Sequence, residues 1–309
     1  MRSGVVTERP MVAVIAGPTA SGKSAMAIMI AEAIMGTIIN ADASQLYADL
    51  HIVSARPAVD DEARVPHRLY GVLDGDDIAN AARWAAMART AIAETLAAGR
   101  VPLLVGGTGL YLTTLIDGIA PVPDIDPDVR ARVRALSTPD AATALAQEDP
   151  PLAARLMAGD QQRLMRGLEV VRSTGRSLLA WQAERQGGIA ADHDIRALVV
   201  DVPREALRAR VEPRLRAMLA SGAVAEVSAL LARGLDPDRP VLRALGVAEF
   251  GAVAAGTLTA EAAIASAATA TRRYQKRQLT WARSQAASWI RVADTDSAMA
   301  ALARRDPPA

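Results

Sequence analysis

The sequence predicts an α/β protein whose parallel sheet core is interrupted by a helical insertion. Short apolar segments alternate with longer helical segments over most of the chain, which is typical of a doubly wound parallel sheet. The apolar run at residues 11–16 leads into a glycine-rich turn and then into a helical stretch at residues 25–35. Between about residues 115 and 194 the strand signals stop and only helical patterns remain. We therefore expect one sheet-based core that the insertion divides in sequence.

Five strands are predicted, each as a short apolar run: residues 12–16, 37–40, 103–105, 197–202 and 289–292. Helices should fill the intervals, for example residues 79–98, and the chain after residue 202 should be helical up to the last strand. Ligands of open parallel sheets bind beyond the carboxyl ends of the strands, so we expect the functional site there. The expected domains are the first part of the core at 10–115, the insertion at 116–194 and the completion of the core at 195–303.

Proline and glycine punctuate the insertion. Pro121, Pro123 and Pro127 mark its entry, and Gly187-Gly188 marks its exit. Between these signals, helical patterns are expected at residues 128–136, 140–147, 151–157 and 160–175. The insertion is therefore predicted to be wholly helical.

The glycine-rich turn at residues 17–24 reads Gly-Pro-Thr-Ala-Ser-Gly-Lys-Ser, the pattern of a phosphate-binding P-loop. Gly17 and Gly22 allow successive backbone N–H groups to point at one phosphate, and the following helix directs its N-terminus at the same anion. Lys23 adds a positive charge, and Ser24 offers a hydroxyl to Mg²⁺. The alternative is a purely structural turn, but the strand, turn and helix together favour binding of a phosphate or diphosphate.

Composition excludes several kinds of site. The 309 residues include no cysteine, which excludes disulfides and cysteine-ligated metals, and the three scattered histidines argue against a histidine-built metal site. No apolar run reaches membrane-spanning length, and the first ten residues lack the apolar segment of a signal peptide, so we expect a cytoplasmic protein without membrane contact. Only two of the 35 basic residues are lysines, Lys23 and Lys276. Codon preference explains this bias simply, but both lysines are also candidates for sites that need a compact ammonium.

Two further strands end in residues that suit a site. Asp42 follows the second strand, where it could act as a general base or hold Mg²⁺ through water; the alternative is a cap on the following turn. The third strand ends in Gly106-Gly107-Thr108, whereas ordinary P-loop NTPases carry an acidic residue there. The glycines allow close approach to a ligand and Thr108 could hydrogen-bond it, unless they form only a tight turn. This ending weakens the prediction of an ATPase.

Arginine is concentrated in two later segments. Helical spacing places Arg210 and Arg214 on one face, where either could clamp a phosphate, although a solvated basic face is the more common explanation. Between Glu261 and Asp294 there is no acidic residue, and cations alternate with aromatic and amide side chains. That mixture favours RNA, since charge suits the backbone, rings stack and amides read base edges; the alternative is a basic surface helix with core aromatics. The cations are Arg272, Arg273, Lys276, Arg277, Arg283 and Arg291, and the other side chains are Tyr274, Gln275, Gln278 and Trp281.

Taken together, these segments resemble the tRNA dimethylallyltransferase (isopentenyltransferase) family. The matching segments run in family order across nearly the whole chain: residues 17–24, 42–47, 63–69, 105–111, 162–170, 218–235 and 276–283. The resemblance implies a P-loop NTPase-like core that transfers a dimethylallyl group from dimethylallyl diphosphate to N6 of adenosine at tRNA position 37, next to the anticodon, and releases diphosphate. It also implies Mg²⁺, the tRNA anticodon stem-loop as partner and, we expect, a monomer.

The same resemblance assigns roles to residues. Asp42 matches the general base, and Arg214, Lys23 and Thr19 complete the predicted catalytic group. The predicted diphosphate ligands are Gly17, Pro18, Thr19, Ala20, Ser21, Gly22, Lys23, Ser24 and Arg214, with Ser24 also on the metal. The predicted tRNA contacts are Asp42, Ala43, Ser44, Gln45, Thr108, Arg130, Gln162, Arg163, Leu164, Met165, Arg166, Arg243, Gly246, Lys276, Arg277, Gln278, Trp281 and Arg283.

Two positions depart from the family pattern. Ser24 stands where Thr is usual and keeps the hydroxyl, whereas Val247 follows Gly246 where the family has Tyr, so a stacking or hydroxyl contact is lost there. Three alternatives remain: a P-loop small-molecule kinase, which would turn over ATP; a prenyltransferase acting on free adenine nucleotides; and a non-catalytic RNA-binding module. The first two leave the basic segment at 276–283 without an RNA, and the third leaves the P-loop and Asp42 without a use.

Overall fold

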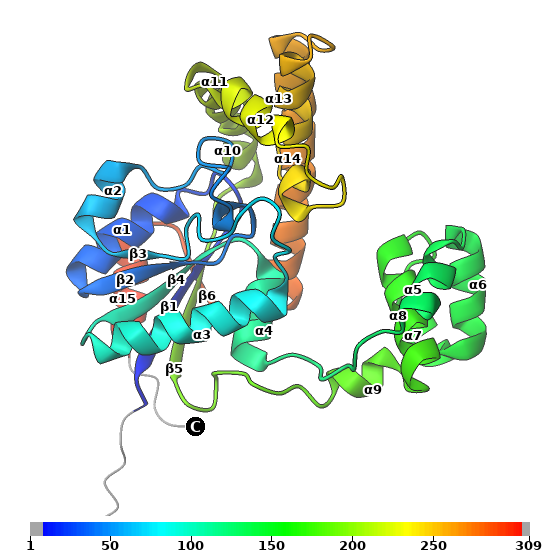
Figure 1. Cartoon of the computed structure of the whole chain (residues 1–309). Helices are drawn as coiled ribbons and strands as arrows, with labels where there is room; N and C mark the ends of the chain where they lie inside the picture. The colour runs from blue at the N-terminus through cyan, green and yellow to red at the C-terminus, as the bar shows by residue number, and fades with distance from the viewer. Residues whose placement is uncertain (1–8, 305–309) are drawn as a thin grey trace, which may run out of the picture. The chain divides into compact units, whose positions relative to one another are not determined.

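The computed structural model describes residues 9–304, so most of the segment on which the absence of a signal peptide was judged lies outside it. The described chain contains a six-stranded, wholly parallel sheet in the order β3-β2-β4-β1-β5-β6 (Figure 1). The strands are β1 (Met11–Ala16), β2 (Gly36–Asn40), β3 (His67–Arg68), β4 (Val101–Gly106), β5 (Asp194–Val200) and β6 (Ile290–Val292). The predicted α/β class with a parallel sheet is confirmed.

The chain divides into two compact units. The first ends at Leu115, resumes at Ala190 and contains the sheet; the second is Ile116–Ile189. Helices before the second unit are α1 (Lys23–Ala33), α2 (Val59–Arg64), α3 (Ala81–Ala97) and α4 (Gly109–Asp117), with a 3₁₀ turn η1 (Ser44–Leu46). Those after it are α10 (Arg204–Ala209), α11 (Val211–Ala220), α12 (Ala223–Ala232), η2 (Pro240–Arg243), α13 (Val247–Ala254), α14 (Ala260–Ser284) and α15 (Thr295–Ala303).

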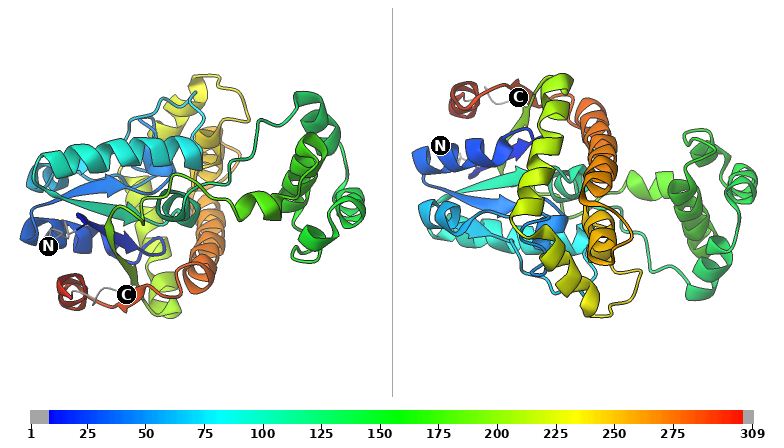
Figure 2. Two further views of the ribbon diagram at one scale, coloured as in Figure 1. Left: turned by 90° about the horizontal axis from the view of Figure 1, so that it is seen from below. Right: turned by 90° about the horizontal axis from the view of Figure 1, so that it is seen from above.

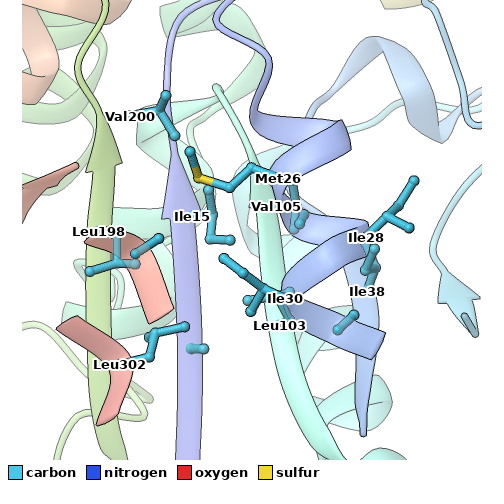
Figure 3. Close-up of a cluster of buried hydrophobic side chains, with 14 of the residues drawn as sticks. Ile15, Met26, Ile28, Ile30, Ile38, Leu103, Val105, Leu198, Val200 and Leu302 are labelled. Atoms are coloured by element: carbon cyan, nitrogen blue, oxygen red, sulfur yellow. The ribbon is translucent and has the colours of Figure 1, made fainter. Parts of the chain in front are cut away.

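Helices cover both faces of the sheet. Helices α1 and α15 pack on one face and α3 on the other (Figure 2). Because side chains alternate along a strand, Ile15 of β1 and Leu103 of β4 point to the α1 face and meet Ile30 there (Figure 3). On the other face, Trp84 of α3 is fully buried and donates from Nε1 to the carbonyl oxygen of Asn40 at 2.8 Å. These contacts fix α1, and so the turn that precedes it, against the strand ends.

All five predicted strands exist, but their limits differ. β5 begins at Asp194 and ends at Val200, because its register with β1 runs from Met11 to Ala16 and pairs these residues with Asp194 to Val199. Trp289 lies one residue before β6. The sequence reasoning missed β3, whose two residues pair only with β2 at the sheet edge. A strand this short has no alternation to detect.

The second unit is helical and has its own core. It comprises α5 (Pro127–Arg134), α6 (Thr138–Glu148), α7 (Pro150–Ala153), α8 (Gln161–Thr174) and α9 (Leu178–Gln182). Leu145, Leu152 and Leu168 are buried together at its centre. Gly167 lies where an added Cβ would meet Leu152 and Leu145, so this glycine allows α8 to approach its neighbours closely. The segment that leads into this unit and the segment that leaves it are joined by an antiparallel bridge between Ile119 and Gln186.

Among residues 9–304, no single helix is both long and apolar enough to cross a bilayer. One pair meets the length and composition criteria together, Arg204–Ala220 with Ala223–Ala232, and it is bent by 67°.

Candidate active site

A cavity of about 290 Å³ lies beyond the carboxyl ends of the central strands. The turn after β1, the segment after β2, and helices α11 and α14 contribute its walls, and all of these belong to the first unit. Residues predicted from separate segments of the sequence therefore meet at one cavity. Lys23, Asp42 and Arg214 all line it.

The P-loop is held in a tight ring at the start of α1. The Gly17 N–H donates to the Gly106 carbonyl at 3.3 Å, and the Ser21 N–H donates to the Pro18 carbonyl at 3.2 Å. Gly22 has φ +91°, a left-handed conformation that favours glycine. Ser21 Oγ is buried and has no hydrogen-bond partner in the described chain, which is a feature that an anionic ligand in the ring would satisfy.

Two glutamines of α14 hold this loop from outside. Gln278 Oε1 accepts from the Thr19 N–H at 2.9 Å, and Gln275 Nε2 donates to the Thr19 carbonyl at 2.9 Å. Gln278 Nε2 also donates to the Gly107 carbonyl at 3.0 Å. Both glutamines are buried, so the Gln278 amide, predicted to contact tRNA, is instead used inside the protein to join the loops after β1 and β4.

Trp281 also has an internal use. Its Nε1 donates to Thr113 Oγ1 at 3.2 Å, its ring lies edge to face with Trp289 at 5.5 Å, and Gly109 is so close that a Cβ would overlap the ring. These contacts correspond to the core-aromatic alternative for the basic segment. Trp281 thus packs α14 against α4, and because its ring is only half-buried the predicted tRNA contact stays a prediction.

Asp42 is fixed by its own turn. Its Oδ1 accepts from the Ser44 N–H at 3.1 Å and from Ser44 Oγ at 2.7 Å, and its N–H donates to Asn40 Oδ1 at 2.8 Å. The next N–H, of Ala43, donates to Thr108 Oγ1 at 3.0 Å. Within the described residues, no hydrogen bond reaches Asp42 Oδ2. One carboxylate oxygen thus caps the turn, as the structural alternative proposed, and the other is left for a ligand in the cavity.

Two cations share the cavity with Asp42. Burial lowers the pKa of Lys23 to about 8; the Asp42 carboxylate opposes this shift and the Arg214 guanidinium adds to it. Burial also lowers the pKa of Arg214, again against the pull of Asp42. Arg214 makes no ion pair with any described residue, whereas Arg210 donates to the P-loop carbonyls of Ala20 and Ser21 at 3.3 and 3.4 Å. Of the two candidate phosphate ligands, Arg214 is thus the one directed at the cavity.

All four tyrosines of the chain line this cavity: Tyr47, Tyr70, Tyr111 and Tyr274. Tyr111 stacks on Trp84 with ring centres 4.9 Å apart, and the Arg277 guanidinium lies 5.2 Å from the ring centre of Tyr274. Burial raises the pKa of all four phenols, and the nearby Asp42 carboxylate raises the pKa of Tyr70, Tyr111 and Tyr274 further. The phenols therefore stay neutral and form a weakly hydrated wall around the carboxylate.

The sequence reasoning missed Glu226, at the start of α12. Its carboxylate accepts three backbone N–H groups, from His51 and Ile52 at 2.8 Å each and from Val53 at 2.9 Å. Gln45 Nε2 donates to the Ser54 and Ala55 carbonyls of the same loop at 3.1 and 2.7 Å. This loop lines the cavity, so Glu226 positions one of its walls. No local sequence signal links a helical glutamate to a loop about 170 residues earlier.

The remaining residues predicted to contact tRNA are distributed over both units. Arg243 lines the cavity and pairs with Asp238 at 2.8 Å, and Gly246 begins α13 with φ +92°. Val247 is buried, so the position that departs from the family pattern packs in the interior. Lys276, Arg277 and Arg283 are exposed on α14.

In the second unit, the predicted segment at residues 162–166 is partly internal. Gln162 and Arg163 are exposed, and Arg163 pairs with Asp160 at 3.4 Å. The Leu164 side chain is buried in the core of the unit, and Met165 packs against the same core. The helical period of α8 places these two side chains inward, so contact through the Leu164 side chain is excluded. Arg166 pairs with Glu169 at 3.7 Å. Arg130 is half-buried on α5.

Few side chains at the cavity could bind a metal ion. The described residues hold no cluster of three or more His, Cys, Asp or Glu side chains suited to a metal ion. Ser24 and Asp42 both line the cavity and offer one hydroxyl and one carboxylate. Mg²⁺ commonly takes one or two protein oxygens and completes its shell with substrate phosphates and water. The residues present therefore fit Mg²⁺ that is shared with a phosphate ligand.

Comparison with known proteins agrees with this arrangement. The family model described as IPP transferase matches residues 45–285. The chain is 58% identical over 281 residues to a protein named tRNA dimethylallyltransferase from Sphingopyxis alaskensis, covering 90% of this chain and 92% of that protein. A protein of the same name from Zymomonas mobilis is 49% identical over 284 residues, covering 92% of this chain and 91% of that protein.

Solved structures give the same result. The full-length tRNA isopentenylpyrophosphate transferase from Bacillus halodurans superimposes with a TM-score of 0.66 at 29% identity and covers 96% of this chain and 94% of that one. A eukaryotic dimethylallyltransferase, determined in crystallographic snapshots of its action on tRNA, gives a TM-score of 0.75 at 26% identity over 88% of this chain and 70% of that chain. The predicted P-loop NTPase-like fold is thus confirmed.

The lowered pKa of Lys23 predicts a pH-dependent affinity for diphosphate. Below about pH 8 the amine is a cation and attracts the anion, and above that value it is progressively neutral, so the affinity should fall as the pH rises through 8. Isothermal titration with inorganic diphosphate and Mg²⁺ from pH 6.5 to 9.5 measures this dependence. Lys23→Arg is the control, because a guanidinium stays charged over this range and titration of the ligand is common to both proteins. Equal pH profiles for the two proteins would contradict the assignment.

The hydrogen bonds of Glu226 predict that its replacement both destabilises the protein and loosens the loop at residues 51–53 beside the cavity. In Glu226→Gln an amide NH₂ replaces one acceptor and faces a backbone donor, so at least one of the three backbone N–H groups loses its partner. The free energy of unfolding should fall by about 1–3 kcal/mol. Urea denaturation measures the fall, and hydrogen exchange should show faster exchange at His51, Ile52 and Val53. Glu205→Gln, at an exposed position of α10, is the matched control. Unchanged exchange at all three amides would refute the role.

Proposed function

The chain belongs to the IPP transferase family, and on this premise we propose that it transfers a dimethylallyl group from dimethylallyl diphosphate to N6 of adenosine 37 of tRNA and releases diphosphate. The observation that carries the proposal is the meeting of three groups at one cavity: the P-loop with Lys23, the guanidinium of Arg214, and the free oxygen of Asp42. Such a site offers positive charge for a leaving diphosphate and a base for the incoming amine.

The donor diphosphate occupies the P-loop in this proposal. The bond that breaks joins the allylic carbon to a diphosphate oxygen, so negative charge grows on the leaving group. The backbone N–H groups of Ala20, Gly22, Lys23 and Ser24, together with the side chains of Lys23 and Arg214, stabilise that charge in a partly buried site, where each interaction is worth more than in water. Ser24 would hold Mg²⁺, which adds positive charge beside the diphosphate.

Asp42 accepts the proton of the nucleophile. An exocyclic amine is a weak nucleophile while neutral, and it becomes strongly acidic as its nitrogen bonds to carbon. Asp42 Oδ2 can take this proton, because Oδ1 is already bound to Ser44 and holds the carboxylate in place. The adenine must leave its stack to reach the cavity, as bases do in other nucleic-acid-modifying enzymes.

The acceptor is bound by the basic surface of α14 and by residues of the second unit. Exposed Lys276, Arg277 and Arg283 suit the phosphates of an anticodon stem-loop, and Gln162 and Arg163 add polar contacts from α8. Lys23, Asp42 and Arg214 all come from the first unit, so the proposed chemistry requires no second copy of the chain, and we propose that the protein acts as a monomer. A tRNA substrate also implies a cytoplasmic location.

The kinase alternative is disfavoured at the end of β4. An added Cβ at Gly106 would overlap the Ala41 backbone, and one at Gly107 would overlap the Gln278 amide. The acidic side chain that ordinary P-loop NTPases place after this strand therefore has no room here.

Incubation of the protein with unmodified tRNA, dimethylallyl diphosphate and Mg²⁺, followed by nucleoside mass spectrometry, tests the function. We expect dimethylallyl-adenosine, one diphosphate released per prenyl group, and no need for ATP. Free AMP in place of tRNA separates this function from prenylation of nucleotides, and should give little product. ATP-dependent turnover without prenylated adenosine would instead favour the kinase.

Replacement of Asp42 tests the base. Asp42→Asn keeps the shape and the acceptor for Ser44 but removes the basic oxygen, so turnover should fall by roughly 10²–10⁴-fold. The affinity for tRNA, measured by filter binding, should change little. Asp296→Asn, on the exposed start of α15, is the control. A mutant that turns over at a near-normal rate would show that another group takes the proton.

A further inference from the structure

A second concave surface lies between α10 and α14 and is strongly basic. This cavity of about 280 Å³, here called the α10–α14 groove, is lined by Arg204 and Arg208 of α10 and by Arg272, Arg273 and Lys276 of α14. Figure 2 shows the yellow-green α10 and α11 beside the orange α14. The five cationic side chains belong to exposed residues.

Little inside the protein neutralises these charges. In residues 9–304, Arg272 pairs with Glu212 at 2.8 Å, and the other four cations form no ion pair. Arg204 and Arg208 are four residues apart on one helix, as are Arg272 and Lys276 on another, and like charges at this spacing destabilise a helix. The whole chain carries a net charge of only +1, so this excess is local. An uncompensated cluster of this kind is suited to an external polyanion.

Helix α14 separates the groove from the reaction cavity. Thr271, Tyr274 and Arg277 line the cavity, whereas Arg272, Arg273 and Lys276 line the groove. Between them, Gln275 reaches the P-loop through its hydrogen bond to the Thr19 carbonyl. A diphosphate held by the P-loop within the cavity therefore has its own cations, Lys23 and Arg214, and leaves those of the groove unused.

We propose that the α10–α14 groove binds backbone phosphates of the tRNA outside the loop that enters the cavity. The inference rests on the proposed function, which supplies an RNA long enough to reach both sides of α14. Arginine suits phosphate because its planar guanidinium can donate two parallel hydrogen bonds. Contacts of this kind position the RNA without reading its sequence. Of the five cations, Arg272, Arg273 and Lys276 lie in the segment whose composition favours RNA, and only Lys276 is among the predicted tRNA contacts; Arg204 and Arg208 are newly assigned to RNA.

The test compares charge-matched variants in tRNA binding. Arg204→Gln/Arg208→Gln removes two charges from the groove, and Arg64→Gln/Arg89→Gln removes two from α2 and α3 at exposed positions. Binding of unmodified tRNA is measured from 50 to 300 mM KCl. The groove variant should bind roughly 10- to 50-fold more weakly at 0.1 M salt, and its plot of log K against log salt should be flatter by about 2, because two fewer phosphates release counterions. Arg273→Gln, from the other wall, should flatten the slope by about 1.

Two outcomes would overturn the groove assignment. One is an affinity and salt slope equal to those of the control variant. The other is a raised KM for dimethylallyl diphosphate with unchanged tRNA affinity, which would make the groove a site for a small anion. Wild-type product formation, measured separately by mass spectrometry, reports on the proposed function. A wild type that binds tRNA through the groove but forms no product would refute the function and leave the groove assignment intact.

Discussion

The buried hydrogen bonds between α14 and the P-loop are the contacts on which the rest of the site depends. Gln275 and Gln278 bind the backbone of Thr19, and Gln278 also binds the carbonyl of Gly107. Three segments that are far apart in sequence are thereby held at one point. Because a buried amide left without its partner costs more than an exposed one, these bonds restrict both the loop and the helix to one arrangement.

The cavity is consequently a product of both halves of the first unit. The part before the second unit supplies the P-loop and Asp42, and the part after it supplies Arg214, Tyr274 and Glu226. Two further hydrogen bonds join the same two parts of the chain. Arg210 donates to the carbonyl of Ala20, and Glu226 accepts from the N–H of Val53. A long insertion between the halves is tolerated because the sheet itself reunites them, with β5 pairing along the whole of β1.

The sequence allowed prediction of the features whose cause is local. The P-loop is defined by eight consecutive residues, and the parallel sheet follows from alternating apolar segments, so both were predictable. Lys23 and Asp42 were expected near one another because strand ends meet at one edge, whereas Arg214 was assigned to the same site only by the family resemblance. Side-chain direction was not predictable in the same way. Gln278, Trp281 and Leu164 were assigned to tRNA by segment, but Gln278 and Leu164 are buried and Trp281 is half-buried with its Nε1 bound to Thr113. Glu226 and β3 depend on tertiary pairing alone and left no local signal.

The glycines at the end of β4 restrict which amino-acid substitutions the site can accept during evolution. At Gly106, Gly107 and Gly109 the first carbon of any side chain would overlap, respectively, the Ala41 backbone, the Gln278 amide and the Trp281 ring. A substitution at Gly107 or Gly109 therefore displaces α14 and, with it, the wall that carries Tyr274 and Arg277, whereas a substitution at Gly106 displaces the backbone of Ala41. Substitutions that alter the cavity without displacing its walls must therefore occur on its exposed side, where a new side chain meets solvent. The floor of the cavity therefore depends on three positions that carry no side chain, and these positions tolerate substitution least.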